Sequence, residues 1–308
     1  MLQRRHIHDY IARHAMLAAT LFAGGLVIAI AVALYLRAHP LLASQSLAAL
    51  LRGHTWAPSR GEFGFLPFIA GTLWVTAVAA ALAVPVCLLA AVYLAEYAGP
   101  RVRAVVKPLI DVLAGIPSVV YGVWGLLVVV PYIAETLGPY AQRHWAHLPL
   151  LHTDYTTGFS ILAGGVVLAI MISPAIIAIA DEVLRAVPRE YREAAQALGA
   201  TRAETITRVV ARKALPGLAA AVVLGLSRAL GETMAVLMVV GNWPHVPTSI
   251  FDGAYPLPAL IANNYGEMMS IPLYDAALLG AAFLLLVLVL AFNLLARVVL
   301  VRATREAV

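Results

Sequence analysis

Long stretches without a charged side chain are the feature that most limits how this chain can fold. Between Glu62 and Glu96 lie 33 uncharged residues, and the 38 residues between Lys213 and Asp252 contain only two charges. A helix needs about 20 apolar residues to cross the hydrocarbon layer of a bilayer. The 308-residue chain is 62% hydrophobic and 12% charged, whereas soluble domains are about half apolar and a quarter charged. The sequence therefore excludes a water-soluble protein and predicts an integral membrane protein.

Six such stretches predict an all-α membrane protein with six transmembrane helices, because single strands cannot satisfy their backbone groups in lipid. The first stretch is longer than the 7–15 apolar residues of a secretion signal, so we interpret it as a retained helix. The expected spans are residues 15–36, 67–95, 109–133, 159–181, 216–241 and 273–296.

The Lys and Arg residues are distributed unequally between the two sides that these spans define. Sixteen lie in the two tails and the alternate connections, and only four in the other connections. Because cytoplasmic segments carry the excess of Lys and Arg, both termini are expected in the cytoplasm. The net charge of +5 is explained in this way, and we expect no nucleic-acid partner.

The longest cytoplasmic connection, at about residues 182–215, contains signals for two short helices. Pro188 suits the first turn of a helix and Gly199 the left-handed residue that ends one. Thr201 and Glu204 have the spacing of a capping box, so a second helix should begin at once. The sequence predicts two helices that meet at a glycine bend. The alternative is an amphipathic loop that lies on the lipid headgroups.

The residues Glu193-Ala194-Ala195, followed by Gly199, resemble the EAA loop of ABC importer permeases. The resemblance implies the type I ABC importer permease fold, and a loop that docks on a separate ATPase subunit. The chain contains neither the GxxxxGK[ST] nor the GxGxxG phosphate-binding pattern. We therefore expect no enzyme activity and no cofactor, and the resemblance implies that two separate ATP-binding subunits supply the energy.

Two charged residues interrupt the fifth span. Arg228 and Glu232 are four residues apart, so on a continuous helix they share one face. Charges within a span usually face the bundle interior or a water path. A guanidinium there suits an oxyanion, since its planar fork matches phosphate or carboxylate oxygens. The alternative is a structural ion pair that locks one helix to another.

The sequence around this pair, from Ser227 through Val236, resembles the PstC type of phosphate importer permease. Three other segments support the resemblance, namely residues 115–122, 259–265 and 273–280. It implies inorganic phosphate as the substrate, with Arg228, Glu232 and Ser227 on the path.

The resemblance also implies partners and a location. These are a homologous second permease of the PstA type, a periplasmic or lipid-anchored phosphate-binding protein, and the lipid bilayer of a bacterial inner membrane. Residues 65–300 would form the permease domain, between a segment 1–64 that holds the first span and a cytoplasmic tail 301–308. A permease for another oxyanion, the PstA-type half and a passive channel remain alternatives.

Three further features lead to weaker expectations. Pro117, in the expected third span, is a possible gating kink because proline frees a backbone carbonyl. His144, His147 and His152 lie in one outer loop, but no Cys or carboxylate pattern accompanies them and we expect no metal. The outer loop 242–272 is rich in aromatic residues and proline and has no Lys or Arg, which suits a membrane-interface belt or a docking surface for the binding protein.

Overall fold

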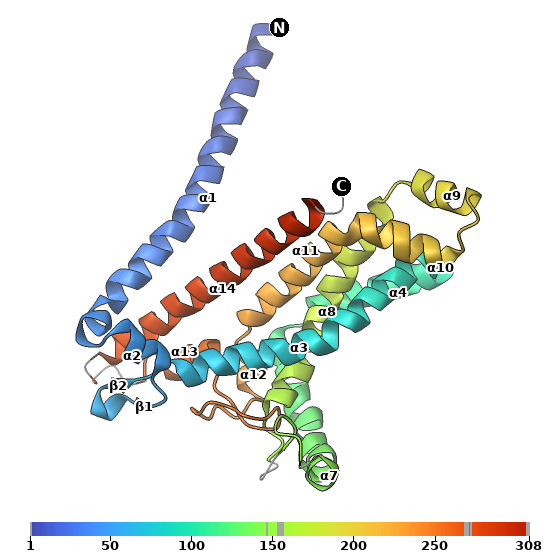
Figure 1. Cartoon of the computed structure of the whole chain (residues 1–308). Helices are drawn as coiled ribbons and strands as arrows, with labels where there is room; N and C mark the ends of the chain where they lie inside the picture. The colour runs from blue at the N-terminus through green and yellow to red at the C-terminus, as the bar shows by residue number, and fades with distance from the viewer. Residues whose placement is uncertain (1, 146, 153–156, 268–270, 272, 306–308) are drawn as a thin grey trace.

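The computed structural model describes residues 2–145, 147–152, 157–267, 271 and 273–305, and it is predominantly helical (Figure 1). Within these residues, six helices are long and apolar enough to cross a membrane. They are Tyr10–Ser44, Leu66–Tyr97, Ser118–His144, Ile161–Ala186, Arg202–Leu230 and Tyr274–Val299. The expected number and order of the spans are confirmed.

These spans are built from the following elements. The first half contains α1 (Leu2–Ser44), α2 (Leu47–Arg52), α3 (Leu66–Val92), α4 (Pro100–Gly115), α5 (Ser118–Trp124), α6 (Val130–Tyr132) and α7 (Gly138–His144). The second half contains α8 (Ile161–Ala186), α9 (Arg189–Ala197), α10 (Arg202–Glu204), α11 (Ala211–Leu230), α12 (Met234–Leu237), α13 (Leu257–Asn264) and α14 (Tyr274–Arg305). Four π-helical turns connect helices, namely η2 (Tyr93–Tyr97), η3 (Gly125–Val129), η4 (Ile133–Leu137) and η5 (Thr205–Val210). A ribbon of β1 (Trp56–Ala57) and β2 (Glu62–Phe63), joined by the 3-10 turn η1 (Pro58–Arg60), precedes α3.

The bounds expected for the third and fifth spans are wrong. The third does not begin at residue 109, because Ile116, which precedes a proline, is extended at φ −69° and ψ 129° and separates α4 from α5. The fifth begins at Arg202, since α10, η5 and α11 form one continuous run, and it ends at Leu230 rather than at residue 241. The charged first turns of this run concealed its start in the hydropathy pattern.

The helices of the bundle run between two ends, which we call the α9 end and the α7 end after the helices found there (Figure 1). The last turns of α3 and α8 pack with the first turns of α11 near the α9 end, in a cluster that includes Ala91, Leu184 and Ala214. Both chain termini point toward the side of the molecule that carries α9. That this side is the cytoplasm stays a prediction.

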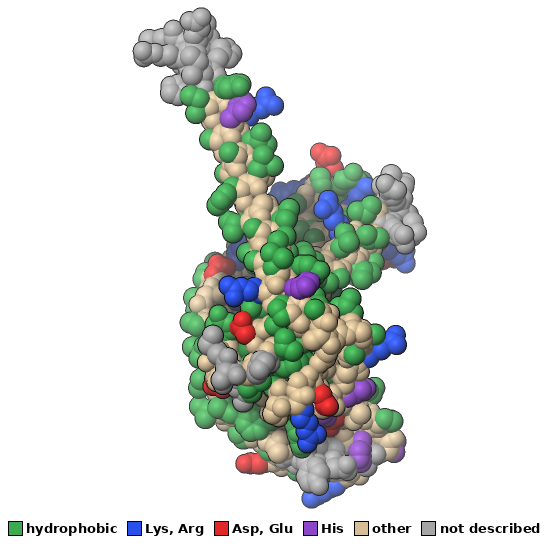
Figure 2. All heavy atoms as spheres, turned by 90° about the vertical axis from the view of Figure 1, so that its left-hand side faces the viewer, with side chains coloured by type: hydrophobic (Ala, Val, Ile, Leu, Met, Phe, Trp, Pro, Cys, Tyr) green, Lys and Arg blue, Asp and Glu red, His purple; other side chains and the backbone are tan. Residues whose placement is uncertain are grey.

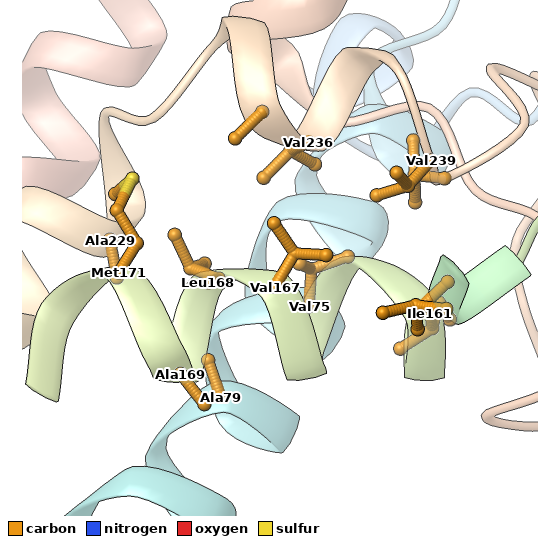
Figure 3. Close-up of a cluster of buried hydrophobic side chains, with 14 of the residues drawn as sticks. Val75, Ala79, Ile161, Val167, Leu168, Ala169, Met171, Ala229, Val236 and Val239 are labelled. Atoms are coloured by element: carbon orange, nitrogen blue, oxygen red, sulfur yellow. The ribbon is translucent and has the colours of Figure 1, made fainter. Parts of the chain in front are cut away.

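The main core lies where α3 crosses α8. Figure 3 shows Val75 and Ala79 of α3 against Val167 and Ala169 of α8. The close approach depends on glycine: a methyl group added to Gly165 of α8 would lie 2.4 Å from a methyl carbon of Val78. Small residues at such crossings let helix backbones approach closely in membranes.

Replacing Gly165 by Leu is therefore expected to weaken the α3–α8 contact. Overfilling a packed core costs about 1–3 kcal/mol, and here the added atoms would meet a side chain fixed on the facing helix. We expect a lower melting temperature and less monodisperse protein on size exclusion in detergent. Gly24→Leu is the matched control, because a methyl group on Gly24 of α1 would have no neighbour within 4 Å. Equal stability of the two variants would contradict this account of the core.

The first helix stands apart from the bundle along most of its length. Its last turns pack on α14, with Ala38 and Leu41 near Gly280. The β1–β2 ribbon covers this junction, where Trp56 contacts Phe68 edge to face at 5.1 Å between ring centres. Figure 2 shows exposed hydrophobic side chains along α1 from Tyr10 onward, as expected of a helix that faces lipid.

Candidate functional site

The fifth span ends in the middle of the molecule, at a break in the helix. Helix α11 ends at Leu230, and the chain is not helical again until Met234 begins the single turn of α12. The backbone N–H groups of Gly231 and Glu232 still bond to Arg228 and Ala229, each at 3.2 Å. Gly231, the first residue beyond α11, lies at φ −95° and ψ −1°.

The depth of the break follows from the packing of α11 on α8, which run in opposite directions. A methyl group on Gly217 would lie 2.4 Å from Val183, and one on Gly225 would lie 2.5 Å from Ile176. By the same register, Arg228 lies level with Ser173, halfway along α8. Non-helical backbone at this depth is tolerated only where it is buried in protein or lines a water-filled cavity.

The break separates the two charged residues that we expected on one helix face, so that expectation is wrong. Arg228 belongs to the last turn of α11, whereas Glu232 lies beyond the end of that helix. A Glu232 oxygen accepts a hydrogen bond from the backbone N–H of Ala235 at 3.3 Å and so caps α12. Among the ion pairs of the described residues, none joins Arg228 to Glu232.

The two side chains also have different surroundings. Arg228 is exposed on the surface of the single chain. Glu232 is half-buried and borders a narrow cavity with Thr72 and Thr76 of α3. In Figure 3, Ala229 lies beside Met171 of α8. This contact fixes the end of α11 against α8.

Ser227 connects α11 to α14. Its hydroxyl lies 2.8 Å from the Val223 carbonyl oxygen and 2.8 Å from Asn293 Oδ1. The Asn293 amide also donates to the Val289 carbonyl oxygen at 2.8 Å. Sequence reasoning missed Asn293, although an amide in an otherwise apolar span was a usable signal, since polar residues in spans commonly bond to neighbouring helices.

Pro117 lies between two helices and not within one. It precedes Ser118, the first residue of α5, with φ −59° and ψ 142°. The hydroxyl of Tyr121 donates to the Leu113 carbonyl oxygen at 2.9 Å and so bridges the break from α5 to α4. A role of this break in gating stays a prediction.

The two helices expected to meet at a glycine bend are present, and the second is the start of the long run from Arg202 to Leu230. Helix α9 follows Pro188, and Gly199 adopts φ +88°. The Thr201 hydroxyl accepts from the Glu204 N–H at 3.3 Å, while a Glu204 oxygen accepts from the Thr201 N–H at 3.0 Å, which confirms the capping box. Glu193 and Ala194 are exposed and Ala195 half-buried.

The opposite end, the α7 end, carries a cavity of about 570 Å³ between the loop before α8 and the loop after α12. His152, Trp243, His245 and Asp252 line it, and none of its described lining residues is Lys or Arg. In the described part of the chain, no three His, Cys or carboxylate side chains form a group that could hold a metal ion. Residues 268–270 and 272 of the expected docking loop, and 306–308 of the tail, lie outside the described residues.

Six spans, a charged residue exposed halfway across them and a glycine-bent loop at one end define the class of protein: a multi-pass membrane permease. Residues 83–305 match the model of the family described as binding-protein-dependent transport system inner membrane component. The chain belongs to this family.

Individual relatives agree with this assignment. The chain is 38% identical to the phosphate transport system permease protein PstC of Xylella fastidiosa (strain 9a5c) over 254 residues, 82% of this chain and 78% of that protein. It is 39% identical to the probable ABC transporter permease protein YqgH of Bacillus subtilis over 244 residues, 79% of this chain and 74% of that protein.

Solved structures of ABC transporters share the fold. A chain of the inward-facing MetNI methionine transporter superimposes with a TM-score of 0.54 at 21% identity, covering 76% of this chain and 93% of its own length. A chain of a bacterial transporter involved in alginate import gives 0.54 at 19% identity, covering 96% and 99%. The ABC importer permease fold is thus confirmed.

Proposed function

We propose that this chain is the PstC-type permease subunit of an ATP-driven phosphate importer in a bacterial inner membrane. The observation that carries the proposal is Arg228, a permanent cation exposed halfway along the spans beside a helix break. Placing such a charge at mid-membrane costs about 2.5–3.5 kcal/mol on insertion scales, so a residue of this kind marks a functional site. The names of the PstC relatives support phosphate as the anion.

The open position of Arg228 also supports a two-permease assembly. On a single chain its guanidinium faces outward, so a second permease of the PstA type would enclose it and complete the path. Two ATP-binding subunits would dock on the α9 end, and a periplasmic or lipid-anchored phosphate-binding protein would deliver substrate at the α7 end. ATP binding would then move the α9–α10 loop and open the path by alternating access.

In such a path, the residues at the break have distinct roles. The Arg228 fork donates two parallel hydrogen bonds to phosphate oxygens. Glu232, which accepts a hydrogen bond from the backbone of α12, places a negative charge beside the path and opposes entry of a second anion. Ser227 positions Arg228 through its bond to α14.

Uptake of labelled phosphate by membrane vesicles that contain this chain with its partner subunits tests the proposal. We expect uptake that requires ATP and the binding protein, and that unlabelled phosphate suppresses but sulfate does not. Uptake without ATP would favour a passive channel. Suppression by sulfate would favour a permease for another oxyanion.

A further inference from the structure

Three arginines from three other segments bind the last residues of the second span, at the α9 end of the molecule. Helix α3 continues through η2, which ends at Tyr97. Arg103 of α4 donates to the carbonyl oxygens of Leu94 at 2.6 Å and Ala95 at 3.2 Å. Arg192 of α9 and Arg202 of α10 both bind the next residue, Glu96. The last carbonyls of a helix lack partners within it, and here side chains from elsewhere supply them.

Arg192 makes the most extensive of these contacts. Its Nη2 lies 2.6 Å from Oε1 of Glu96, and its Nε lies 3.2 Å from each carboxylate oxygen. The same guanidinium donates to the carbonyl oxygens of Val187 at 2.6 Å and Leu184 at 2.9 Å. One side chain therefore joins α9 to the ends of both α3 and α8. The pair is largely shielded from water, with side-chain exposures of 19% for Arg192 and 9% for Glu96.

Arg202 approaches Glu96 from the other side of the glycine bend. It donates to the Glu96 carbonyl oxygen, and its guanidinium lies 4.7 Å from the centre of the Tyr97 ring. Gly199, between the two arginines, is in the left-handed conformation and has open space around it. The two helices of the loop thus bind the same residue of η2: α9 binds the side chain of Glu96, and α10 binds the Glu96 backbone.

Helix α9 also packs against η5, at the start of the fifth span. It contains no buried residue. The Lys213 ammonium lies 5.2 Å from the centre of the Tyr191 ring, an exposed contact. Because α9 contributes no buried side chain, the polar cluster around Glu96 is what ties α9 to the second span. We call Glu96, Arg192 and Arg202 the loop clamp.

We propose that the loop clamp transmits movement of the α9–α10 loop to the second span, with Glu96 and Arg192 as the positioning residues. The inference rests on the proposed function, in which ATPase subunits move this loop. A displacement of α9 pulls on the Glu96 carboxylate, and a displacement of α10 pulls on its backbone. Both reach α3, whose other end packs through Phe68 against Trp56 and Tyr255. Without the ion pair, α9 can follow the ATPase subunits while α3 is held only through the bond from Arg202 of α10.

The first test measures phosphate uptake and ATP hydrolysis in proteoliposomes that hold the complete transporter. For Glu96→Gln and Arg192→Gln we expect normal binding of the ATPase subunits and about tenfold less phosphate moved per ATP hydrolysed, the size typical of losing a charged hydrogen bond. The double variant should be no worse than either single one, because both changes remove the same interaction. Glu96→Asp, which keeps the charge, should recover part of the ratio.

Arg208→Gln is the matched control. Arg208 lies in the same connection and pairs with Glu204 at 3.6 Å, and its side chain is 78% exposed. It should keep the wild-type ratio. An unchanged ratio in Glu96→Gln, or a loss fully explained by fewer bound ATPase subunits, would overturn the inference.

A second readout does not depend on the substrate. In a Cys87→Ala background, spin labels at Leu82 of α3 and Leu290 of α14, both exposed, report the distance between these spans when ATP is trapped in the complete transporter. We expect a distance change in the wild type that is clearly smaller in Glu96→Gln. If the wild type moves no phosphate but this difference persists, the proposed substrate is wrong and the loop clamp stands. A distance change of equal size in Glu96→Gln would refute the clamp.

Discussion

Replacing Arg228 by Gln is expected to lower phosphate uptake sharply, while the amount of assembled transporter stays the same. Glutamine keeps most of the length of the side chain but loses the charge and the paired donors of the guanidinium. A hydrogen bond to a charged group contributes about 1.5–3 kcal/mol, so uptake should fall by about tenfold to 150-fold or more. Initial rates of labelled phosphate uptake in vesicles measure the effect.

Arg228→Lys refines this prediction. Lysine retains the charge but presents a single ammonium group in place of the planar fork, so we expect uptake between that of the wild type and that of Arg228→Gln. Because Arg228 makes no ion pair with Glu232 in the structure, assembly should survive both changes. Retained uptake with impaired assembly would instead favour a structural role for this arginine.

Replacing Leu198 by Asp should remove the ATPase subunits from the complex. Leu198 follows α9 directly and is 90% exposed, an unusual position for a large apolar side chain. Central apolar contacts of an interface can contribute about 2 kcal/mol or more, and a carboxylate there adds a desolvation cost. We expect at least about a thirtyfold loss of affinity, measured by titrating purified ATPase subunits onto the permease in detergent.

Leu47→Asp is the control for this change. Leu47 is 64% exposed in α2, near the opposite end of the molecule, and the same substitution there should leave ATPase binding intact. Glu193→Lys, which reverses the charge of an exposed residue in α9, should also weaken binding. Normal ATPase binding by both Leu198→Asp and Glu193→Lys would contradict the assignment of α9 as the docking helix.

The number of spans could be predicted because each one is a run of apolar residues about as long as a bilayer is thick. The first and last residues of a span could not be predicted where the ends of the helix differ from the ends of the uncharged stretch. The helix from Arg202 to Leu230 begins among arginines outside the apolar run, and the break at Ile116 falls inside one. Hydropathy reports the solvent that a segment meets, whereas helix ends depend on backbone geometry.

At the candidate site, too, the sequence predicted which residues matter but not how they are arranged. The sequence identified Arg228 and Glu232 as the charges within the spans, and it placed Ser227 beside them. The spacing of four residues suggested one helix face, but Gly231 ends α11 between them and turns Glu232 toward α12. Asn293 and Glu96 are remote in sequence from the residues they bind, and no local pattern joins them.

The sequence alone determined the membrane environment, the helical class, the glycine-bent loop and its capping box, since each follows from local composition or short-range hydrogen bonding. Only the tertiary structure decided that α11 stops halfway across the bundle, that the Arg228 side chain is exposed on the single chain, and that α9 and α10 both bind Glu96. These facts depend on how α11 packs against α8 and on contacts between segments about a hundred residues apart. Such contacts form only when the chain has folded, because the register between two helices is set by the side chains of both.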